Sequence, residues 1–398
     1  MCKKMREVVV SLTSYPTRIR KLYNVLNSIM EQTYKPKAVV LYLSTDQFPD
    51  KMMPIDLTIY FEQGLEIHWY QDDLKSHKKY LYAFQEYPDD YIITIDDDFY
   101  YERHMIEELI YYIDKFPQCI LARRTHLITM QSDGSISSYE NWWGECLHYI
   151  GVPRMDLFAV GCGGILYPPH LFTQEVFHIN YIKKYCMYAD DVWLKVMELI
   201  SGISVVQVPT RCLDKLDEYF AHDGLYQQHN GNGGNDRSLY QLLQKYNHFE
   251  GMKEALNERI FSTGIVYENE VTEGRKKDNI RLLKECIASI DGDMDIVIYG
   301  AGIVAERLYD ILKQRGMENK IRAFVVENTD SNIQDMKGID VVQYQNADYK
   351  NAICIIAISC LNEQDWVYRQ LLSIGLEENQ VFFLNHWMLS GLRDIAGA

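Results

Sequence analysis

The sequence predicts an α/β protein in which a large domain on a mostly parallel sheet, covered by helices on both faces, precedes a smaller α/β domain. Three observations predict this fold class. Strand and helix signals alternate over about the first 260 residues, a polar stretch at 262–277 interrupts them, and a second alternation follows. The length of 398 residues suits two domains better than one core.

The elements of the first domain are predicted from their apolar periodicity. Short β-branched runs indicate buried strands, and apolar residues three and four apart indicate helices. Strands are expected at residues 6–12, 37–44, 65–70 and 91–95, and helices at 21–32, 74–87 and 104–116. Such an alternation implies helices on both sheet faces and ligands bound beyond the carboxyl ends of the strands.

After residue 117 the first domain becomes irregular, and long irregular stretches within a domain are usually lids or binding loops. The notable stretches are NWWGE (141–145), GCGGILYPP (161–169), DDVWLKVMELI (190–200) and HNGNGGND (229–236). The last, rich in Gly and Asn, has the composition of a lid over a bound ligand.

We place the boundaries of the first domain at 1–262, of a linker and helix at 263–290, and of the smaller domain at 291–398. YGAGIVAERL puts Gly300 and Gly302 in a G-x-G-x-x-A turn between a strand and a helix, a turn that suits a phosphate. Glu327 ends the next strand, where it could bind ribose hydroxyls. The alternative is a structural or oligomerisation module without a ligand, which leaves a homo-oligomer open.

Composition limits the partners and the compartment. No run of 18 apolar residues suggests a membrane span, and the apolar part of the N-terminus, Val8 to Leu12, is short enough to be a first strand. Nine cysteines without a C-x2-C pair indicate reduced thiols and a cytoplasmic protein. A net charge of −16 disfavours nucleic acid as a partner. An anionic substrate therefore requires a local basic cluster or a metal.

YIITIDDDFYY (91–101) runs a buried strand into three carboxylates. Because strand side chains alternate, Asp96 and Asp98 should project to one side and Asp97 to the other. Carboxylates held close together raise one another's pKa unless a cation lies between them. Mg²⁺ and Mn²⁺ take carboxylate and phosphate oxygens, so the motif suits a metal that shares a phosphorylated substrate. A solvated acidic turn before the next helix is the alternative.

With these motifs in order, the chain resembles the GT-A glycosyltransferases, close to the family 2 type of bacterial surface polysaccharide (capsule and lipopolysaccharide) synthesis. Residues 8–36 resemble their first strand, nucleotide loop and first helix, and DDD resembles their DxD strand. Residues 72–84 stand where that family has a basic segment, and ADDVWL (189–194) resembles the acidic motif with the catalytic base. The resemblance covers about residues 6 to 250. LSTDQFPD departs from the family's acidic pair and weakens Asp46 as a nucleobase contact.

The resemblance implies a metal-dependent inverting transfer of a sugar from a nucleoside-diphosphate donor, expected to be a UDP-sugar, to an acceptor hydroxyl. Asp191 is the expected catalytic base, with Asp190 as the alternative. The other expected contacts are Thr13, Tyr15, Arg18, Asp46, Lys79, Asp96 and Asp97 for the nucleotide; Asp98, Asp96 and His229 for Mn²⁺ or Mg²⁺; and Trp142, Trp143, Gly163 and Gly164 for the donor or acceptor sugar. His222 is a further candidate for a metal or diphosphate contact.

Each of these residues also has a purely structural interpretation. The Asp190–Asp191 pair could be an acidic helix start, the two tryptophans could be core, and a single histidine is more often structural. A sugar nucleotidyltransferase is a competing class, but SLTSYPTRI lacks the glycine-rich loop of that class. An NAD-linked sugar-modifying enzyme would depend on the second domain alone. The acceptor is expected to be a saccharide or lipid-linked; a lipid-linked one at the inner face of the cell membrane would require peripheral association.

Overall fold

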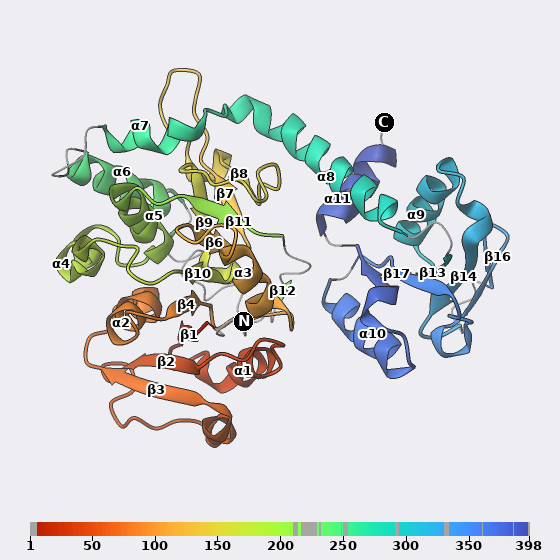
Figure 1. Cartoon of the computed structure of the whole chain (residues 1–398), viewed down its shortest axis with the longest axis horizontal. Coiled ribbons are helices and arrows are strands. Elements are labelled where there is room, and N and C mark those ends of the chain that lie inside the picture. The colour runs from red at the N-terminus through yellow and green to blue at the C-terminus, as the bar shows by residue number, and fades with distance from the viewer. Residues whose placement is uncertain are drawn as a thin grey trace, which may run out of the picture. The chain divides into compact units, whose positions relative to one another are not determined.

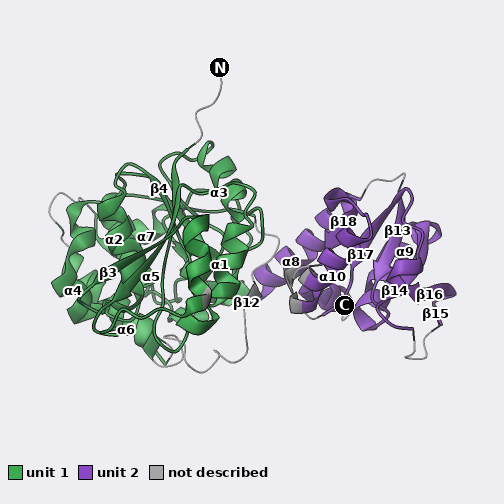
Figure 2. Ribbon diagram, turned by 90° about the horizontal axis from the view of Figure 1, so that it is seen from below, with its two compact units in different colours: residues 1–271 green, residues 272–398 purple. Residues whose placement is uncertain are grey.

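The computed structural model describes residues 6–209, 214–215, 229–230, 232–247, 249, 254–290, 294–329, 334–359, 361–384 and 386–396. The chain divides into two compact units, Met1–Val271 (unit 1) and Thr272–Ala398 (unit 2) (Figure 2). Each unit is built around its own sheet. Within the described residues, no helix combines the length and the apolar character needed to cross a membrane.

Unit 1 contains a seven-stranded sheet with the order β11-β6-β10-β4-β1-β2-β3 (Figure 1). The neighbours β4, β1, β2 and β3 pair in parallel, as do β6 and β11, while β10 runs antiparallel between β4 and β6. The strands are β1 (Val8–Thr13), β2 (Ala38–Ser44), β3 (Leu65–Tyr70), β4 (Tyr91–Thr94), β6 (Ile120–Ala122), β10 (Ile165–Tyr167) and β11 (Val205–Gln207). Smaller antiparallel groups join β5 (Phe99–Tyr100) to β12 (Asp214–Lys215), and β7 (Thr125–Leu127) to β8 (Trp143–Gly144) and β9 (Leu157–Ala159).

Helices cover both faces of this sheet because its strands are apolar on both sides. Along β1, Val9 packs into one core cluster, whereas Val8 and Val10 pack into the other. The first cluster includes residues of α2 (Lys78–Glu86), α4 (Ile179–Tyr185), α5 (Asp190–Ser201), α6 (Gly234–Tyr246) and α7 (Leu256–Ile260). The second includes residues of α1 (Tyr23–Met30) and α3 (Met105–Ile113).

Unit 2 contains a six-stranded sheet with the order β15-β16-β14-β13-β17-β18. All of its strands except β15 pair in parallel, and β16-β14-β13-β17-β18 is the 3-2-1-4-5 order of a doubly wound sheet. The strands are β13 (Asp295–Tyr299), β14 (Ile321–Val326), β15 (Asp335–Met336), β16 (Ile339–Gln343), β17 (Ala352–Ile356) and β18 (Val381–Phe383). The helices are α8 (Val271–Ala288), α9 (Ile303–Gln314), α10 (Leu361–Ser373) and α11 (His386–Ala396).

The predicted fold class is therefore confirmed: a mixed sheet with helices on both faces, followed by a smaller α/β unit. The helix predicted at 74–87 is shorter, because a 3-10 turn at Lys75–His77 precedes α2. The strands β6, β10 and β11 lie in the stretch that the sequence leaves irregular. Each has only three residues, too few for an alternating pattern to emerge.

Candidate active site

Unit 1 has a cavity of about 880 Å³ where β1 and β4 end. β10 runs antiparallel, so its beginning, and not its end, lies beside the end of β4. Segments distant in the sequence thereby line one cavity. They include residues 13–18 after β1, 75–79 before and in α2, 96–99 after β4, 158–162 before β10, and 188–191 at the start of α5.

Arg18 neutralises two of the three consecutive aspartates. Its Nη1 lies 2.8 Å from Asp97 Oδ1 and 2.9 Å from Asp98 Oδ2, and the Ser14 hydroxyl donates to Asp97 Oδ2 at 2.5 Å. Burial works against the charge of Arg18, but Asp97 and then Asp98 raise the pKa of the guanidinium overall. Burial raises the pKa of Asp97. Arg18 and Ser14, in the loop after β1, therefore stabilise the negative charge at the end of β4.

Lys79 joins the two acidic motifs. Its side chain is only 3% exposed, and its Nζ lies 2.5 Å from Asp96 Oδ1 and 3.0 Å from Asp190 Oδ2. Burial disfavours the ammonium, yet Asp190 and then Asp96 raise the pKa of Lys79 well above its usual value. One buried cation thus holds together carboxylates that lie 94 positions apart in the chain.

Asp190 and Asp191 have opposite protonation tendencies. Burial alone would raise the pKa of Asp190, but the charge of Lys79 lowers it below the usual value. For Asp191, burial and then the charge of Asp190 raise the pKa well above the usual range. A carboxylate that ionises at a higher pH is a stronger base, so Asp191 is the better proton acceptor of the two.

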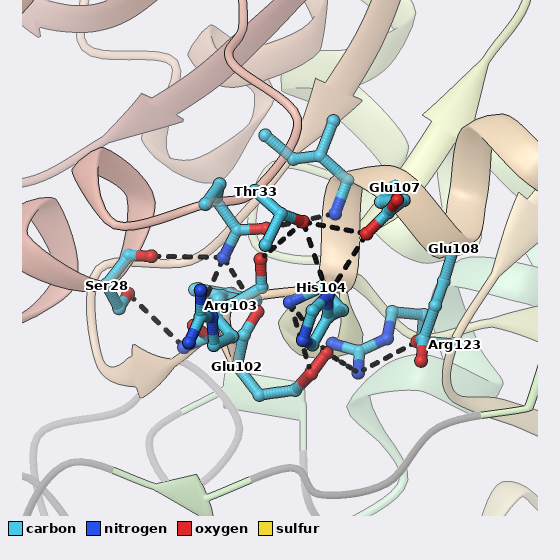
Figure 3. A network of polar contacts seen from close by, with 11 residues as sticks. Ser28, Thr33, Glu102, Arg103, His104, Glu107, Glu108 and Arg123 are labelled. Carbon is cyan, nitrogen blue, oxygen red and sulfur yellow. Dashed lines mark hydrogen bonds and ion pairs between the residues drawn. The ribbon is translucent and has the colours of Figure 1, made fainter. Parts of the chain in front are cut away.

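The segment after the aspartates is anchored by a polar network at the start of α3 (Figure 3). The Thr33 hydroxyl donates to Glu107 Oε2 at 2.9 Å, and His104 Nδ1 lies 3.0 Å from the same oxygen. Buried Arg123 lies 3.8 Å from Glu102 and 3.6 Å from Glu108. These contacts lie outside the cavity, and they fix the chain that leads away from its acidic wall.

The metal ligands expected from the sequence are only partly brought together. Asp96, Asp98 and His229 all line the cavity, but the His229 ring stacks on Tyr188 with ring centroids 3.8 Å apart. Across the described parts of the chain, no three His, Cys, Asp or Glu residues are grouped to hold a metal. Two carboxylates nevertheless suit Mg²⁺ or Mn²⁺, which commonly take one or two protein carboxylates and complete their shell with substrate phosphates and water. His222 lies outside the described residues.

The charge balance of the cavity also fits such a cation. Its walls carry six aspartates and five lysines and arginines. A nucleoside diphosphate would add further negative charge to this nearly balanced set. Either a divalent cation or the release of basic side chains from their aspartate partners is needed to bind it. The donor set of Asp96 and Asp98 therefore fits a metal shared with a diphosphate.

The structure separates the other expected residues into those at the cavity and those away from it. Thr13, Tyr15, Arg18, Lys79, Asp96 and Asp97 all line it. Asp46 is exposed and does not line it, whereas its neighbour Gln47 does. Trp142 and Trp143 are 3% and 4% exposed and belong to the core, which is the bland alternative that the sequence left open.

The glycine turn before β10 approaches the acidic pair through a residue that the sequence did not single out. Gly161 donates its backbone N–H to Asp191 Oδ2 at 3.1 Å. The expected sugar contacts Gly163 and Gly164 do not line the cavity. A Cβ at Gly163 would lie 2.7 Å from Arg124 Cβ, and Gly164 has a φ of +85°. These two glycines thus permit packing and a turn, and Gly161 permits contact with the acidic pair.

The cavity also contains residues without a recognisable local signal in the sequence, namely His126, Tyr139, Phe158 and Tyr188. They come from short strands, a 3-10 turn and a loop, so only the tertiary fold brings them together.

In unit 2, the three residues of the predicted nucleotide-type turn lie near the ends of β13 and β14. Gly300 has a φ of +120°, and a Cβ there would lie 2.7 Å from Ala357 O, so glycine is required. A Cβ at Gly302 would meet nothing within 4 Å. Glu327 is exposed just after β14.

Comparisons with known proteins give structural similarity alone. No protein-family model matches the chain, and no curated protein matches it. It is similar to a structure of S. aureus TarS, with 13% identity and a TM-score of 0.31, over 72% of this chain and 50% of that one. It is also similar to TarS 1–349 (15% identity, TM-score 0.34, 70% and 80% covered) and to TarS 1–349 in complex with UDP (15%, 0.34, 71% and 81%). The chain spans half the length of the longer TarS structure. We therefore infer function from the residues of the cavity.

Proposed function

We propose that the protein is a glycosyltransferase of the GT-A type that moves a sugar from a nucleoside diphosphate, a UDP-sugar by preference, to the hydroxyl of a saccharide or lipid-linked acceptor. One observation carries the proposal: Lys79 joins Asp96, from the phosphate-side motif, to Asp190, from the base motif, within one cavity. A solvated acidic turn would not need a buried lysine as its partner.

On the donor side, negative charge develops on the diphosphate as the bond between the sugar and its phosphate breaks. Lys79 and Arg18 are the buried cations nearest to the aspartates after β4, and their N–H groups can donate to phosphate oxygens. Asp96 and Asp98 would hold Mg²⁺ or Mn²⁺. When bound, the cation would neutralise charge on the leaving diphosphate as a Lewis acid.

On the acceptor side, a hydroxyl is a poor nucleophile until its proton is removed. Asp191 takes that proton as the acceptor oxygen forms its bond to the anomeric carbon, and the electron pair of the broken bond leaves with the diphosphate. The Gly161 N–H keeps Asp191 oriented, and Asp190 remains ionised beside Lys79. A single displacement of this kind inverts the anomeric carbon.

Surface polysaccharide synthesis in the cytoplasm, with peripheral association at the inner face of the cell membrane for a lipid-linked acceptor, is the setting that we propose for this activity. It follows from the resemblance of the ordered motifs to family 2 enzymes. The residues of the cavity support only donor binding and proton transfer, and they carry no argument about the acceptor or the cellular setting.

A donor panel tests the proposal. Purified protein is mixed with UDP-, GDP- and dTDP-sugars, with and without Mn²⁺, and release of the nucleoside diphosphate is measured. We expect release from one donor class, its suppression by a chelator, and a loss of about 100-fold or more in transfer for Asp191→Asn. Transfer at the wild-type rate by Asp191→Asn would contradict the base assignment. Pyrophosphate release from a nucleoside triphosphate and a sugar phosphate would instead indicate a nucleotidyltransferase.

A further inference from the structure

Tyr101 links Asp96, the first of the three aspartates after β4, to the glycine turn at residues 161–164. It is fully buried, and it does not line the cavity itself. Its hydroxyl accepts a hydrogen bond from the backbone N–H of Asp96 at 2.9 Å and donates one to the backbone oxygen of Cys162 at 3.0 Å.

The turn that Tyr101 holds is also the turn that holds the proposed base. Gly161, next to Cys162, donates its N–H to Asp191 Oδ2. A Cβ at Gly161 would lie 2.9 Å from both Asp191 Oδ1 and Lys79 Nζ. A small displacement of this turn would therefore move Asp191 and press on Lys79.

Tyr101 cannot readily follow such a displacement, because its own backbone is fixed. Its N–H donates to the Ser28 hydroxyl at 3.3 Å, and its carbonyl accepts from Gln32 Nε2 at 3.3 Å. Ser28 belongs to the polar network at the start of α3 (Figure 3). On its other side the turn packs tightly, since a Cβ at Gly163 would lie 2.9 Å from the Arg124 backbone nitrogen.

We propose that Tyr101 is a positioning residue for sugar transfer: its hydroxyl sets the distance between Asp96, on the donor side, and Asp191, on the acceptor side, without touching either substrate. The inference rests on the proposed function and deepens it. Hydrogen-bonding groups on rigid elements are what hold catalytic side chains within the tolerance that reaction geometry requires.

Tyr101→Phe tests the proposal because it removes only the hydroxyl. We expect kcat for transfer to fall on the order of 10- to 100-fold, as misplacement of reacting groups does, with KM for the donor changed less than about threefold. Donor hydrolysis should fall less than transfer, since water does not need the acceptor geometry. The matched control is Tyr42→Phe, which removes another fully buried hydroxyl, one that donates to Glu86 at 2.7 Å outside the cavity. Its transfer rate should stay within about twofold of wild type.

Amide hydrogen exchange supplies a readout that does not depend on activity. In Tyr101→Phe, the amides of Asp96 and of residues 161–163 should exchange faster than in wild type, and in Tyr42→Phe they should not. If wild type transfers sugar but Tyr101→Phe matches Tyr42→Phe in kcat, KM and exchange, the proposal is overturned. If wild type transfers nothing from any donor, the proposed function fails, and unchanged exchange would then overturn the positioning role as well.

A second variant covers the case in which Tyr101→Phe does not fold. Gly161→Ala leaves Tyr101 intact and places a methyl group of the turn against Asp191 and Lys79. It should give the same pattern, with kcat for transfer reduced more than the affinity for the donor. Wild-type transfer by Gly161→Ala would contradict the claim that the turn sets the position of Asp191.

Discussion

Asp190 and Asp191 are adjacent in the sequence and line the same cavity, yet their different contacts give them different acid–base properties. Asp190 forms an ion pair with Lys79, whereas Asp191 accepts the Gly161 N–H. Adjacent carboxylates in a buried site cannot both ionise easily, and the one with the closer cation ionises first. The pair is therefore poised as one fixed anion and one proton acceptor.

The pH dependence of transfer should report this pair. Asp191 must be deprotonated to act as a base, and its pKa is raised by burial and by Asp190. The rate should therefore rise with pH through a value above the ordinary aspartate pKa of about 3.9. Asp190→Asn removes a charge that raises the pKa of Asp191, so the rising limb of a kcat–pH profile should move to lower pH.

Asp72→Asn is the control for that profile, because Asp72 is exposed and pairs with Lys183 at 2.7 Å away from the cavity. Asp72→Asn should leave the rising limb of the kcat–pH profile at the same pH as in wild type. A limb that stayed fixed or moved upward in Asp190→Asn would show that the titrating group is not Asp191.

At the scale of elements, the site depends on how the start of α2 is joined to the turn before α5. His77, fully buried, places Nε2 2.8 Å from the Cys186 oxygen and Nδ1 2.8 Å from the Tyr80 hydroxyl. A carbonyl only accepts, so Nε2 carries the proton, and burial lowers the pKa of His77 and keeps it neutral. This bridge connects the element with Lys79 to the chain that enters α5.

His77→Phe should destabilise unit 1 by about 1–3 kcal/mol. It removes the buried hydrogen bond to the Cys186 carbonyl, which keeps only the Ala189 N–H, and it takes away the His77 partner of the buried Tyr80 hydroxyl. The midpoint of urea unfolding measures this, and His77→Gln, whose amide can donate, should recover part of the loss. His170→Ala, at an exposed histidine paired with Asp89, should change stability by less than about 0.5 kcal/mol. A midpoint for His77→Phe equal to that of His170→Ala would argue against the bridge.

The elements also show how far sequence patterns reach. The strands β1 to β4 and the helices α1 to α3 were predictable, since each carries enough apolar residues for its period to emerge. The direction of β10 was not, because three residues, ILY, have no pattern that tells antiparallel from parallel. The sequence identified Asp96, Lys79 and Asp191 because they belong to motifs. It did not identify Gly161 or Tyr101, because their roles depend on contacts that only the folded chain makes. The tryptophans show the converse, since NWWGE is conspicuous in sequence yet Trp142 and Trp143 lie in the core.

At the scale of the whole molecule, the net charge is −16, and the six aspartates of the cavity nearly balance its five lysines and arginines. We therefore expect an anionic donor to bind more tightly with a divalent cation than without one. Mn²⁺ and UDP together should raise the melting temperature of the full chain by about 5 °C or more at 100 times the dissociation constant, following the linkage of binding to stability. Differential scanning fluorimetry measures the shift, and each ligand alone should give a smaller one.

The double variant Asp96→Asn/Asp98→Asn should lose the joint effect, whereas Asp46→Asn, outside the cavity, should keep it. An equal shift with UDP alone and with UDP plus Mn²⁺ would argue that Lys79 and Arg18 suffice for the diphosphate.

The double contact of Lys79 also bears on the sequence of events in a catalytic cycle. The Lys79 ammonium group has three N–H donors, and Asp96 and Asp190 together engage two of them. A diphosphate that enters can take the third N–H, and its charge then competes with both aspartates for the ammonium, which weakens the hold of Lys79 on Asp190. Such a protein would work in compulsory order, taking the donor first and the acceptor second, and product-inhibition kinetics would display that order.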